Sequence, residues 1–536
     1  MTSVLPRTQM QLEIDGGSLS IPDVVAVARG GAQASLVHEA EERIEASREL
    51  KRDLMEREIP IYGVTTGFGD SAHRQIAPAK AGRLQQMVLR DLGCGTGPIA
   101  SPEVTRATML LRANCLAKGN SGVRRELVER LLAFLNADAL PQIPERGSCG
   151  ASGDLVPLSY VASALVGEAD VRQDGVIRSS REVFGELGLE PLELEAKEGL
   201  GLVNGTSFTS AFAALAAWDS QQLAYVADLC TAMASEALLG NRGHFNAFLF
   251  EAKPHPGQME SARVVRELLA DSGLALDSEE IFAGGMDGRE FQELHRQVQD
   301  RYSIRCSPHV VGAMRDTLEW VARWVEVEIN SSDDNPLFDT GSGRVQSGGN
   351  FYAGHMGQAM DSLKVALANV CDLLDRQLEL VVDEKFNAGL TPNLIPFFDA
   401  DHPEAGLHHG FKGMQLCSSA MTAEALKLCN PATIHSRSTE AHNQDKVSMG
   451  TIAARDARSI VELAQNIAAI HLLAVTQALD LRGPEKASTG TRAAHDLVRS
   501  RVAHLDGDRR MDGDIAQVVE LIRSGELSEI ARAAAA

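Results

Sequence analysis

Gly147-Ser148-Cys149-Gly150-Ala151-Ser152-Gly153-Asp154-Leu155 is the stretch around which the rest of this sequence is organised. It holds three glycines among other small residues, so it cannot form the interior of an ordinary helix or strand. Pro141 and Pro144 precede it, and an apolar run follows it. The stretch therefore predicts a loop that can hold strained backbone, as functional sites often do.

The centre of this loop, Ala151-Ser152-Gly153, allows two interpretations. Because no side chain crowds the nitrogen of Gly153, that nitrogen could attack the Ala151 carbonyl in a compressed loop. Loss of water from the new ring and from Ser152 would leave a methylidene-imidazolone, an electrophile made from the chain itself. Alternatively, the loop only caps the next helix, with Ser152 or Asp154 as the N-cap. The tripeptide alone does not decide between them.

Composition favours a large helical protein. The 536 residues are 44% hydrophobic but only 4% aromatic, and the many Ala and Leu suit close-packed helices better than sheets. The net charge of -22 argues against nucleic acid or an anionic membrane as the main partner. Eight scattered cysteines without a CxxC pair indicate reduced thiols and a cytoplasmic location. Met1 to Asp15 shows no signal-peptide pattern, and no apolar run predicts a membrane span.

Helical periodicity recurs along the chain and predicts a mainly α fold, with a long-helix bundle as its core and a loop-rich N-terminal region. Because several of these helices carry few charges on any face, we expect them to be buried among other helices. We divide the chain into an N-terminal region (1–205), a central bundle (206–482) and a short helical tail (483–536). The predicted helices span residues 32–56, 78–92, 101–118, 123–136, 154–167, 207–239, 258–271, 313–330, 356–382, 410–429 and 446–481, and a hairpin with a helix is expected in 170–187.

Asp91-Leu92-Gly93-Cys94-Gly95-Thr96-Gly97 resembles the first glycine-rich motif of class I S-adenosylmethionine methyltransferases. That motif works where a parallel strand delivers the glycines to a helix N-terminus. Here helical residues precede the motif and two more predicted helices follow it, without β-α-β alternation. The sequence therefore argues against a methyltransferase.

Several segments change the interpretation of the Ala-Ser-Gly loop. Gly147 to Ser159 resembles the signature of the aromatic amino acid ammonia-lyase and 2,3-aminomutase family, which includes phenylalanine, tyrosine and histidine ammonia-lyases. The resemblance spans roughly residues 18–483 and implies an ammonia-lyase-like helical fold and a homotetramer whose active sites combine loops of several subunits. The other matching segments, in the family's order and spacing, are Ile61–Gly69, Lys197–Thr206, Tyr302–Pro308, Asp334–Leu337 and Asn443–Gly450.

The resemblance also implies the catalytic residues. Ala151-Ser152-Gly153 would form the methylidene-imidazolone autocatalytically, with no metal or nucleotide expected. Tyr62 matches the family's catalytic base; because the usual pKa of tyrosine is about 10, we expect the site to lower it. Tyr302 matches a second tyrosine of the site, and Asn204 matches the residue that supports the prosthetic group.

A second set of residues matches positions that the family uses around the substrate. Arg305 matches the carboxylate anchor, a role that suits a guanidinium group. Asn335 matches a residue near the substrate carboxylate, and Glu440 matches the acid near the substrate amine in phenylalanine and histidine ammonia-lyases. The full set expected to bind the substrate is Gly69, Asp91, Leu92, Leu155, Arg305, Asn335, Glu440, Asn443 and Gln444.

Asp91 departs from the family's pattern at the pair of residues that meets the substrate side chain, where His-Leu, Phe-Leu or Ser-His is usual. A buried carboxylate without a partner is costly. We therefore hypothesise a substrate whose side chain carries a cation or a hydrogen-bond donor. In the alternative, Asp91 pairs with Arg90 or another protein group and the pocket is ordinary. Met87, Asp333 and the residues after Phe351 also differ from the usual pattern.

The expected reaction is elimination of ammonia from an L-α-amino acid with an aromatic or otherwise activated side chain, which gives an α,β-unsaturated acid. A 2,3-aminomutase would use the same residues and return the amine to the β-carbon, and residue spacing does not separate the two. A helical assembly protein with a dead site is disfavoured, because Tyr62, Ser152, Tyr302 and Arg305 are all present. The expected partner is a small amino acid, with no role for nucleic acid or membrane.

Overall fold

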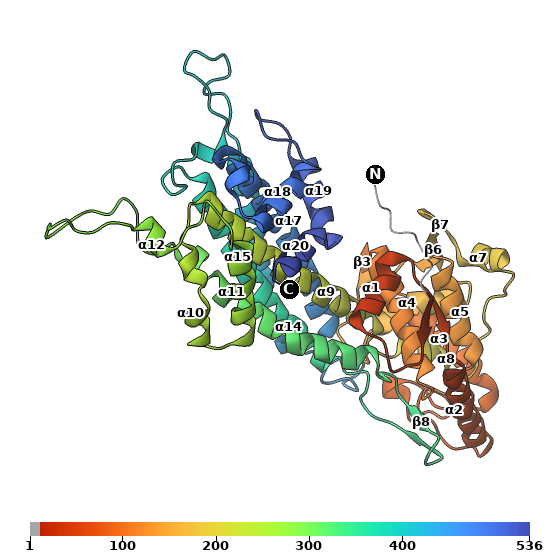
Figure 1. Ribbon diagram of the computed structural model, residues 1–536. Coiled ribbons are helices and arrows are strands. Elements are labelled where there is room, and N and C mark those ends of the chain that lie inside the picture. The colour runs from red at the N-terminus through yellow and green to blue at the C-terminus, as the bar shows by residue number, and fades with distance from the viewer. Residues whose placement is uncertain (1–10, 536) are drawn as a thin grey trace. The chain divides into compact units, whose positions relative to one another are not determined.

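The protein is mainly helical, as predicted. The computed structural model describes residues 11–535, and helices account for about 58% of the chain (Figure 1). The prediction made for Met1 to Met10 lies outside the described residues.

The chain forms two compact units, each assembled from separate stretches of sequence. Unit 1 comprises Met1–Trp218, Val321–Asp361 and Pro431–Arg458, and unit 2 comprises Asp219–Trp320, Ser362–Asn430 and Ser459–Ala536. The division into three consecutive regions stays a prediction. Four long helices contribute residues to both units: α9 (Ser207–Ala237), α14 (Ser307–Ile329), α15 (Gly354–Val382) and α17 (Gly450–Arg482).

Unit 1 contains helices and small β-sheets of two or three strands (Figure 1). Its helices are α1 (Ile21–Gly30), α2 (His38–Glu56), α3 (Ala81–Leu92), α4 (Pro102–Ala117), α5 (Arg125–Asn136), α6 (Leu155–Leu165), α7 (Ser180–Leu187) and α8 (Glu198–Val203). Its strands are β1 (Gln11–Ile14), β2 (Gln33–Leu36), β3 (Thr96–Ile99), β4 (Leu140–Pro141), β5 (Pro144–Arg146), β6 (Asp170–Gln173), β7 (Val176–Ser179), β8 (Leu337–Asp339) and β9 (Arg344–Gln346).

The pairing of these strands is simple. β1 and β2 run parallel with Gln11 opposite Gln33, whereas β3–β5, β4–β6–β7 and β8–β9 are antiparallel. Of the methyltransferase-like glycines, Gly93 and Gly95 lie between α3 and β3, and Gly97 lies within β3, which pairs with β5 in antiparallel fashion. That motif therefore lacks the parallel strand that its nucleotide-binding role requires.

Unit 2 consists of helices among its described residues. Besides its parts of the four long helices, it contains α10 (Ala247–Glu251), α11 (Pro256–Leu268), α12 (Ser278–Ile281), α13 (Tyr302–Arg305), α16 (Lys412–Leu428), α18 (Thr489–Arg499), α19 (Asp512–Arg523) and α20 (Glu526–Ala535). The last three confirm the predicted helical tail.

Every predicted long helix is present, with ends that differ by a few residues. Helix α1 was not among the predicted helices. Its start is a capping box, because the Ser20 side chain accepts from the Asp23 N–H while the Asp23 carboxylate accepts from the Ser20 N–H. That cap outweighs the β-branched valines of this helix, whose intrinsic helix propensity is modest.

Helix α17 is long and apolar enough to cross a membrane by length and composition alone. Most of that apolar stretch, 78% of it, is buried within the protein. A buried core helix of a folded protein passes the same test, so α17 gives only weak support for a membrane span.

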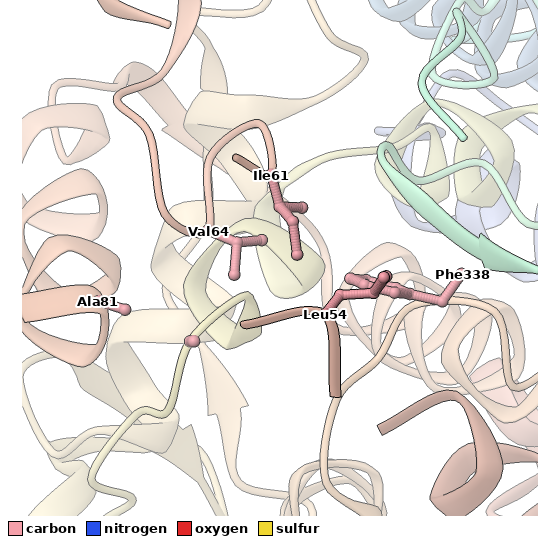
Figure 2. Packing of buried hydrophobic residues seen from close by; sticks show 6 residues of the cluster. Leu54, Ile61, Val64, Ala81 and Phe338 are labelled. Atoms are coloured by element: carbon pink, nitrogen blue, oxygen red, sulfur yellow. The ribbon is translucent and has the colours of Figure 1, made fainter. Parts of the chain in front are cut away.

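A small apolar cluster anchors the loop that carries Tyr62. Leu54 of α2 packs with Ile61 and Val64 of the loop, with Ala81 at the start of α3, and with Phe338 of β8 (Figure 2). Ala196 completes this cluster. The carbonyl of Ile61 also accepts the N–H groups of the three residues that follow Gly63. The base of the loop is therefore fixed by apolar packing on one side and by its own turn on the other.

We expect Leu54→Ala to loosen this base. Leu54 is 3% exposed, so the truncation should cost about 2–5 kcal/mol of stability. The expected result is a lower Tm together with faster amide hydrogen exchange in residues 61–66. Val176→Ala, at a position that is 62% exposed, is the matched control. Equal Tm and equal exchange in the two variants would contradict the anchoring role.

Candidate active site

Unit 1 contains a cavity of about 620 Å³, and all residues that line it belong to this unit. Its walls come from the Tyr62 loop, α3, the Ala-Ser-Gly loop, the end of α8, the β8–β9 region and the loop before α17. The predicted site residues that line it are Tyr62, Gly69, Asp91, Leu92, Ala151, Ser152, Leu155, Asn204, Asn335, Glu440, Asn443 and Gln444.

The Ala-Ser-Gly loop is a tight turn with left-handed backbone. Ser152 has φ 54°, and Gly150 and Gly153, with φ 77° and 74°, pair with each other across the turn. A serine seldom adopts this conformation, which costs about 1–3 kcal/mol unless its surroundings impose it. The backbone is thus tightly turned at the residues that hold the ring-forming atoms, the Gly153 nitrogen and the Ala151 carbonyl.

The turn at Gly205 imposes that conformation. The Gly205 N–H donates to the Ser152 carbonyl (3.2 Å), and the Asp154 N–H donates to the Gly205 carbonyl (2.7 Å). A Cβ atom on Gly153 would collide with the Gly205 carbonyl, so only glycine fits there. The Ser148 hydroxyl holds the Gly153 carbonyl at 3.1 Å.

Asp154 fastens this loop to two long helices. Its carboxylate accepts the Thr209 N–H (2.7 Å) and hydroxyl (2.8 Å) in the first turn of α9, and the Thr451 hydroxyl (2.6 Å) in the first turn of α17. Burial raises the pKa of Asp154, although these hydrogen bonds oppose the shift. Asp154 therefore acts as a cap for α9 rather than for the helix that follows it.

Two buried ion pairs support the other side of the Gly205 turn. Arg112 donates to Asp333 (2.6 Å) and to the Asn204 carbonyl (2.8 Å), and Lys197 pairs with Asp334 (2.5 Å). Burial lowers the pKa of Lys197, and Asp334 opposes this. Burial also disfavours the charged form of Arg112, but Asp333 holds its pKa above the ordinary value. Removing one member of such a pair leaves an uncompensated charge.

Asn204 connects these pairs with the cavity. Its side-chain amide donates to the Asp334 carboxylate (3.1 Å) and to the Asn335 carbonyl (3.0 Å). The Asn335 side chain in turn accepts the Gly348 N–H (2.8 Å). Both asparagines are buried, so their orientation is set by the protein and not by solvent.

Tyr62 lies in the cavity wall, where its hydroxyl oxygen accepts the Gly69 N–H at 2.9 Å. Burial raises the pKa of Tyr62, the Gly69 hydrogen bond opposes this, and the nearby Glu440 carboxylate adds to the rise. The expectation that the site lowers the pKa of Tyr62 is therefore wrong, because the residues of this chain raise it. The reason is that burial of the hydroxyl dominates and the Glu440 charge adds to it, whereas the expectation assumed that positive amide ends would prevail.

The loop before α17 brings polar groups over the Ala-Ser-Gly turn. Glu440, Ala441 and His442 all have left-handed backbone, which curls this segment toward the cavity. The Gln444 amide donates to the Ser152 hydroxyl at 3.1 Å. Burial raises the pKa of Glu440, and the Asp70 and Asp91 carboxylates add to the rise.

Asp91 lies in the last turn of α3 and has no hydrogen-bond or ion-pair partner among residues 11–535. Its neighbour Arg90 pairs instead with Glu168, at 2.6 and 3.0 Å. The alternative that Asp91 pairs with Arg90 is therefore wrong. Asp91 faces the cavity as a carboxylate open to a ligand.

Three predicted residues do not line the cavity. Gly153 lies directly behind Ser152, against Gly205. Tyr302 and Arg305 lie on α13 in unit 2, where Tyr302 is 73% exposed and the Arg305 guanidinium stacks 4.5 Å above its ring. Neither Tyr302 nor Arg305 is therefore among the residues that line the cavity of unit 1.

The sequence analysis did not identify the apolar residues of α3 that form one wall of the cavity. Leu84 and Val88 line the cavity together with Met87 and Asp91, at positions that recur every three or four residues. Because residues 78–92 were predicted as a helix, this spacing was a usable signal for one helix face. Other lining residues without a predicted role are Phe68, Asp70, Ser71, Leu200, Gly348, Phe351, Tyr352, Asp445, Lys446 and Val447.

Comparisons with known proteins agree with this architecture. Residues 19–500 match the family model of aromatic amino acid lyases. Histidine ammonia-lyases of Gloeobacter violaceus and Myxococcus xanthus are 40% and 38% identical to the chain, and the alignments cover 98% of it and 98% and 99% of those proteins.

Solved structures give the same result. Tyrosine aminomutase from Streptomyces globisporus superposes with a TM-score of 0.92 at 36% identity, covering 97% of this chain and 98% of that one. Histidine ammonia-lyase from Trypanosoma cruzi superposes with a TM-score of 0.87 at 32% identity, covering 98% and 96%. The chain belongs to the aromatic amino acid lyase family, and it is an amino acid ammonia-lyase or a 2,3-aminomutase.

Proposed function

We propose that the protein eliminates ammonia from an L-α-amino acid to give an α,β-unsaturated acid. The observation that carries this proposal is the tight Ala151-Ser152-Gly153 turn, which contributes to the wall of the same cavity as Tyr62. The reaction needs an electrophile for the amine and a base for a weakly acidic β-hydrogen. The turn and the tyrosine are the groups in the cavity that can supply these two functions.

The prosthetic group of this proposal is a methylidene-imidazolone formed from the turn. The Gly153 nitrogen would bond to the Ala151 carbonyl carbon, and loss of that carbonyl oxygen and of the Ser152 hydroxyl as two water molecules would complete the ring. The left-handed Ser152 and the close Gly153–Gly205 contact fit such a compression. When formed, this electrophile would capture the amine and make it a better leaving group.

The remaining residues bind and position the substrate. Tyr62, as the phenolate, would take the β-proton, and Asn204, fixed by Asp334, would support the ring. Asn335 and Glu440 would meet the polar end of the substrate, with Asn443 and Gln444 beside them. Gly69, Leu92 and Leu155 would complete the walls, because each lines the cavity.

Asp91 would select the substrate side chain. It lacks a protein partner in the described chain, and the cavity also contains Asp70, Glu440 and Asp445 against a single cation, Lys446. A carboxylate-rich end of the cavity favours a side chain that carries a cation or a hydrogen-bond donor. Such a group would also remove the cost of leaving Asp91 unpaired once the substrate excludes water.

We further propose a cytoplasmic homotetramer with shared active sites. Tyr302 and Arg305 are absent from the cavity of the single chain, although the reaction needs a cation for the substrate carboxylate. The α13 of another subunit, on which Tyr302 is exposed, would supply both residues.

A 2,3-aminomutase is the second candidate. The observation in its favour is the likeness to tyrosine aminomutases, whose solved structures superpose with TM-scores of 0.91 and 0.92. Such an enzyme would return the amine to the β-carbon of the bound acid. Product analysis separates the two readings, because one gives free unsaturated acid and the other a β-amino acid.

The intact mass of the purified chain tests the proposal directly. We expect a mass lower than that of the plain sequence by two water molecules. Ser152→Ala should show the plain mass and lose about 10³-fold or more in kcat. Ser163→Ala, on α6 and outside the cavity, should keep the mass deficit. A wild-type mass equal to the plain sequence would exclude both candidate functions.

The role of Asp91 predicts a change in selectivity. In Asp91→Phe, kcat/KM for amino acids with cationic or donor side chains should fall at least about tenfold relative to phenylalanine. Met87→Leu, one turn earlier on the same helix face, is the matched control. An unchanged order of substrates in Asp91→Phe would contradict the selectivity role.

The charge of Glu440 predicts a shift in the pH profile. Glu440 raises the pKa of Tyr62, and the base acts as the phenolate, so activity should rise with pH through that pKa. Glu440→Gln removes the negative charge, lowers the pKa of Tyr62 and should move the rising limb of kcat/KM to lower pH. Asp445→Asn, also in the cavity, serves as the control. A limb that stays in place would show that Tyr62 does not titrate in this step.

A further inference from the structure

Thr206 immediately follows Gly205, and its side chain contacts two carboxyl groups. The Thr206 hydroxyl oxygen lies 2.7 Å from an oxygen of Glu328 and 2.7 Å from an oxygen of Asp333. Both distances are those of an O–H···O hydrogen bond. Thr206 precedes α9, Glu328 lies in the last turn of α14, and Asp333 follows that helix, and all three belong to unit 1.

One hydroxyl cannot donate to both carboxyl groups. A threonine hydroxyl carries a single proton, although its oxygen can also accept a hydrogen bond. If both carboxyl groups were ionised, one of the two 2.7 Å contacts would have no proton and would bring two electron-rich oxygen atoms together. One of the two carboxyl groups therefore carries a proton and donates it to the Thr206 oxygen.

Asp333 is the ionised member of the two. One of its oxygens accepts from Arg112 at 2.6 Å and from the Cys115 thiol at 2.8 Å, and the other accepts the Thr206 N–H at 2.8 Å. A proton on Asp333 would leave the buried Arg112 guanidinium without its counter-charge, which is strongly destabilising. The proton therefore belongs to Glu328.

The surroundings of Glu328 favour the neutral acid. Burial raises the pKa of Glu328 to about 7; the Thr206 hydrogen bond opposes this shift, and the Asp333 and Asp154 carboxylates add to it. Glu328 also lies at the C-terminal end of α14, where the helix dipole disfavours a negative charge. Among residues 11–535 it has no ion-pair partner that would hold it as a carboxylate.

Glu328 acts on the candidate site through Thr206. When Glu328 donates to the Thr206 oxygen, the hydroxyl proton is left for Asp333, which then accepts both the hydroxyl and the N–H of Thr206. The preceding residue, Gly205, holds the Ser152 carbonyl at 3.2 Å. We propose that Glu328 is a proton-bearing positioning residue, which directs the Thr206 hydroxyl onto Asp333 and so fixes the Gly205 turn behind the Ala-Ser-Gly loop.

Loss of this proton reverses the arrangement, because two carboxylates then compete for the one hydroxyl proton of Thr206. The pKa of Glu328 in the folded chain is raised above its ordinary value of 4.5, so the folded chain binds the proton more tightly than the unfolded chain. The stabilising contribution of Glu328 is therefore fully present below about pH 4.5 and is lost as the pH rises through about 7. Glu328→Gln cannot ionise and should lack this pH dependence.

Infrared difference spectroscopy of the full chain tests the protonation. The spectrum of the wild type minus that of Glu328→Gln, recorded at about pH 6, should contain the C=O stretching band of a protonated carboxyl group, and this band should disappear above about pH 8. Glu326→Gln, at an exposed position two residues earlier on α14, is the matched control and should give no such band. Absence of the band from the Glu328 difference spectrum overturns the proposal.

Turnover tests the positioning role, and this part rests on the proposed function. Glu328→Met has no donor for Thr206 and should lose at least about tenfold in kcat, whereas the Glu328→Gln amide can donate and should recover most of that loss. The ratio of the wild-type kcat to that of Glu328→Gln should fall at least about threefold between about pH 6 and pH 8, because only the wild type loses the proton. Titration of Tyr62 affects both proteins and cancels in this ratio.

Two kinetic results would overturn the positioning role: a ratio that does not change with pH, or a kcat of Glu328→Met equal to that of the wild type. Failure of the proposed function is distinguishable, because the infrared band is measured without turnover and ring formation is read from the intact mass. A wild type with the band but without the mass deficit supports the protonation of Glu328 and excludes the proposed function. A mass deficit without the band supports the function and overturns the role of Glu328.

Discussion

The close approach of two glycine backbones, Gly153 and Gly205, is the constraint on which the site depends. A Cβ atom on Gly153 would collide with the Gly205 backbone, and a Cβ atom on Gly205 would collide with the Arg112 and Asp333 side chains, so neither position accepts a side chain. The Gly205 turn is itself held by the buried Arg112–Asp333 pair and by Thr206, whose N–H donates to Asp333 at 2.8 Å. A buried pair of this kind contributes little net stability but has one favourable geometry. Its effect here is to fix backbone rather than to strengthen the fold.

Charge is distributed in two different ways around this turn. Behind it, Arg112 and Lys197 are each matched by an aspartate and shielded from water. In front of it, the carboxylates of Asp91 and Glu440 line a cavity that contains four acidic residues and one cation, Lys446. The buried ion pairs hold the turn in one conformation, whereas the cavity carboxylates can interact with a molecule that enters the cavity. The residues behind the turn therefore fix its conformation, and the residues in front of it are available for binding the substrate.

The sequence predicted the long helices because their apolar periodicity is local, and it predicted the cavity set because the motifs carry rare residue combinations. It could not predict the direction of the pKa shift of Tyr62, which depends first on burial and then on Glu440, far away in sequence. The sequence also left open whether Asp91 pairs with Arg90, because the residue that pairs with Arg90, Glu168, is far away in sequence. Tyr302 and Arg305 were expected with the others, but they lie on α13 in unit 2 and do not line the cavity. Helix α1 was missed because a local cap, not periodicity, decides it.

The discontinuous composition of unit 1 has a consequence for how the protein is made. Its three stretches end at Trp218, Asp361 and Arg458, so the chain leaves this unit and returns to it twice during synthesis. Arg112 and Lys197 are made long before Asp333 and Asp334, and the nascent N-terminal part holds two cations without their counter-charges. Gln444 and Thr451, which hold Ser152 and Asp154, arrive later still. The turn therefore obtains all of these contacts only after most of the chain has been synthesised, so the ring proposed to form from it would be completed late.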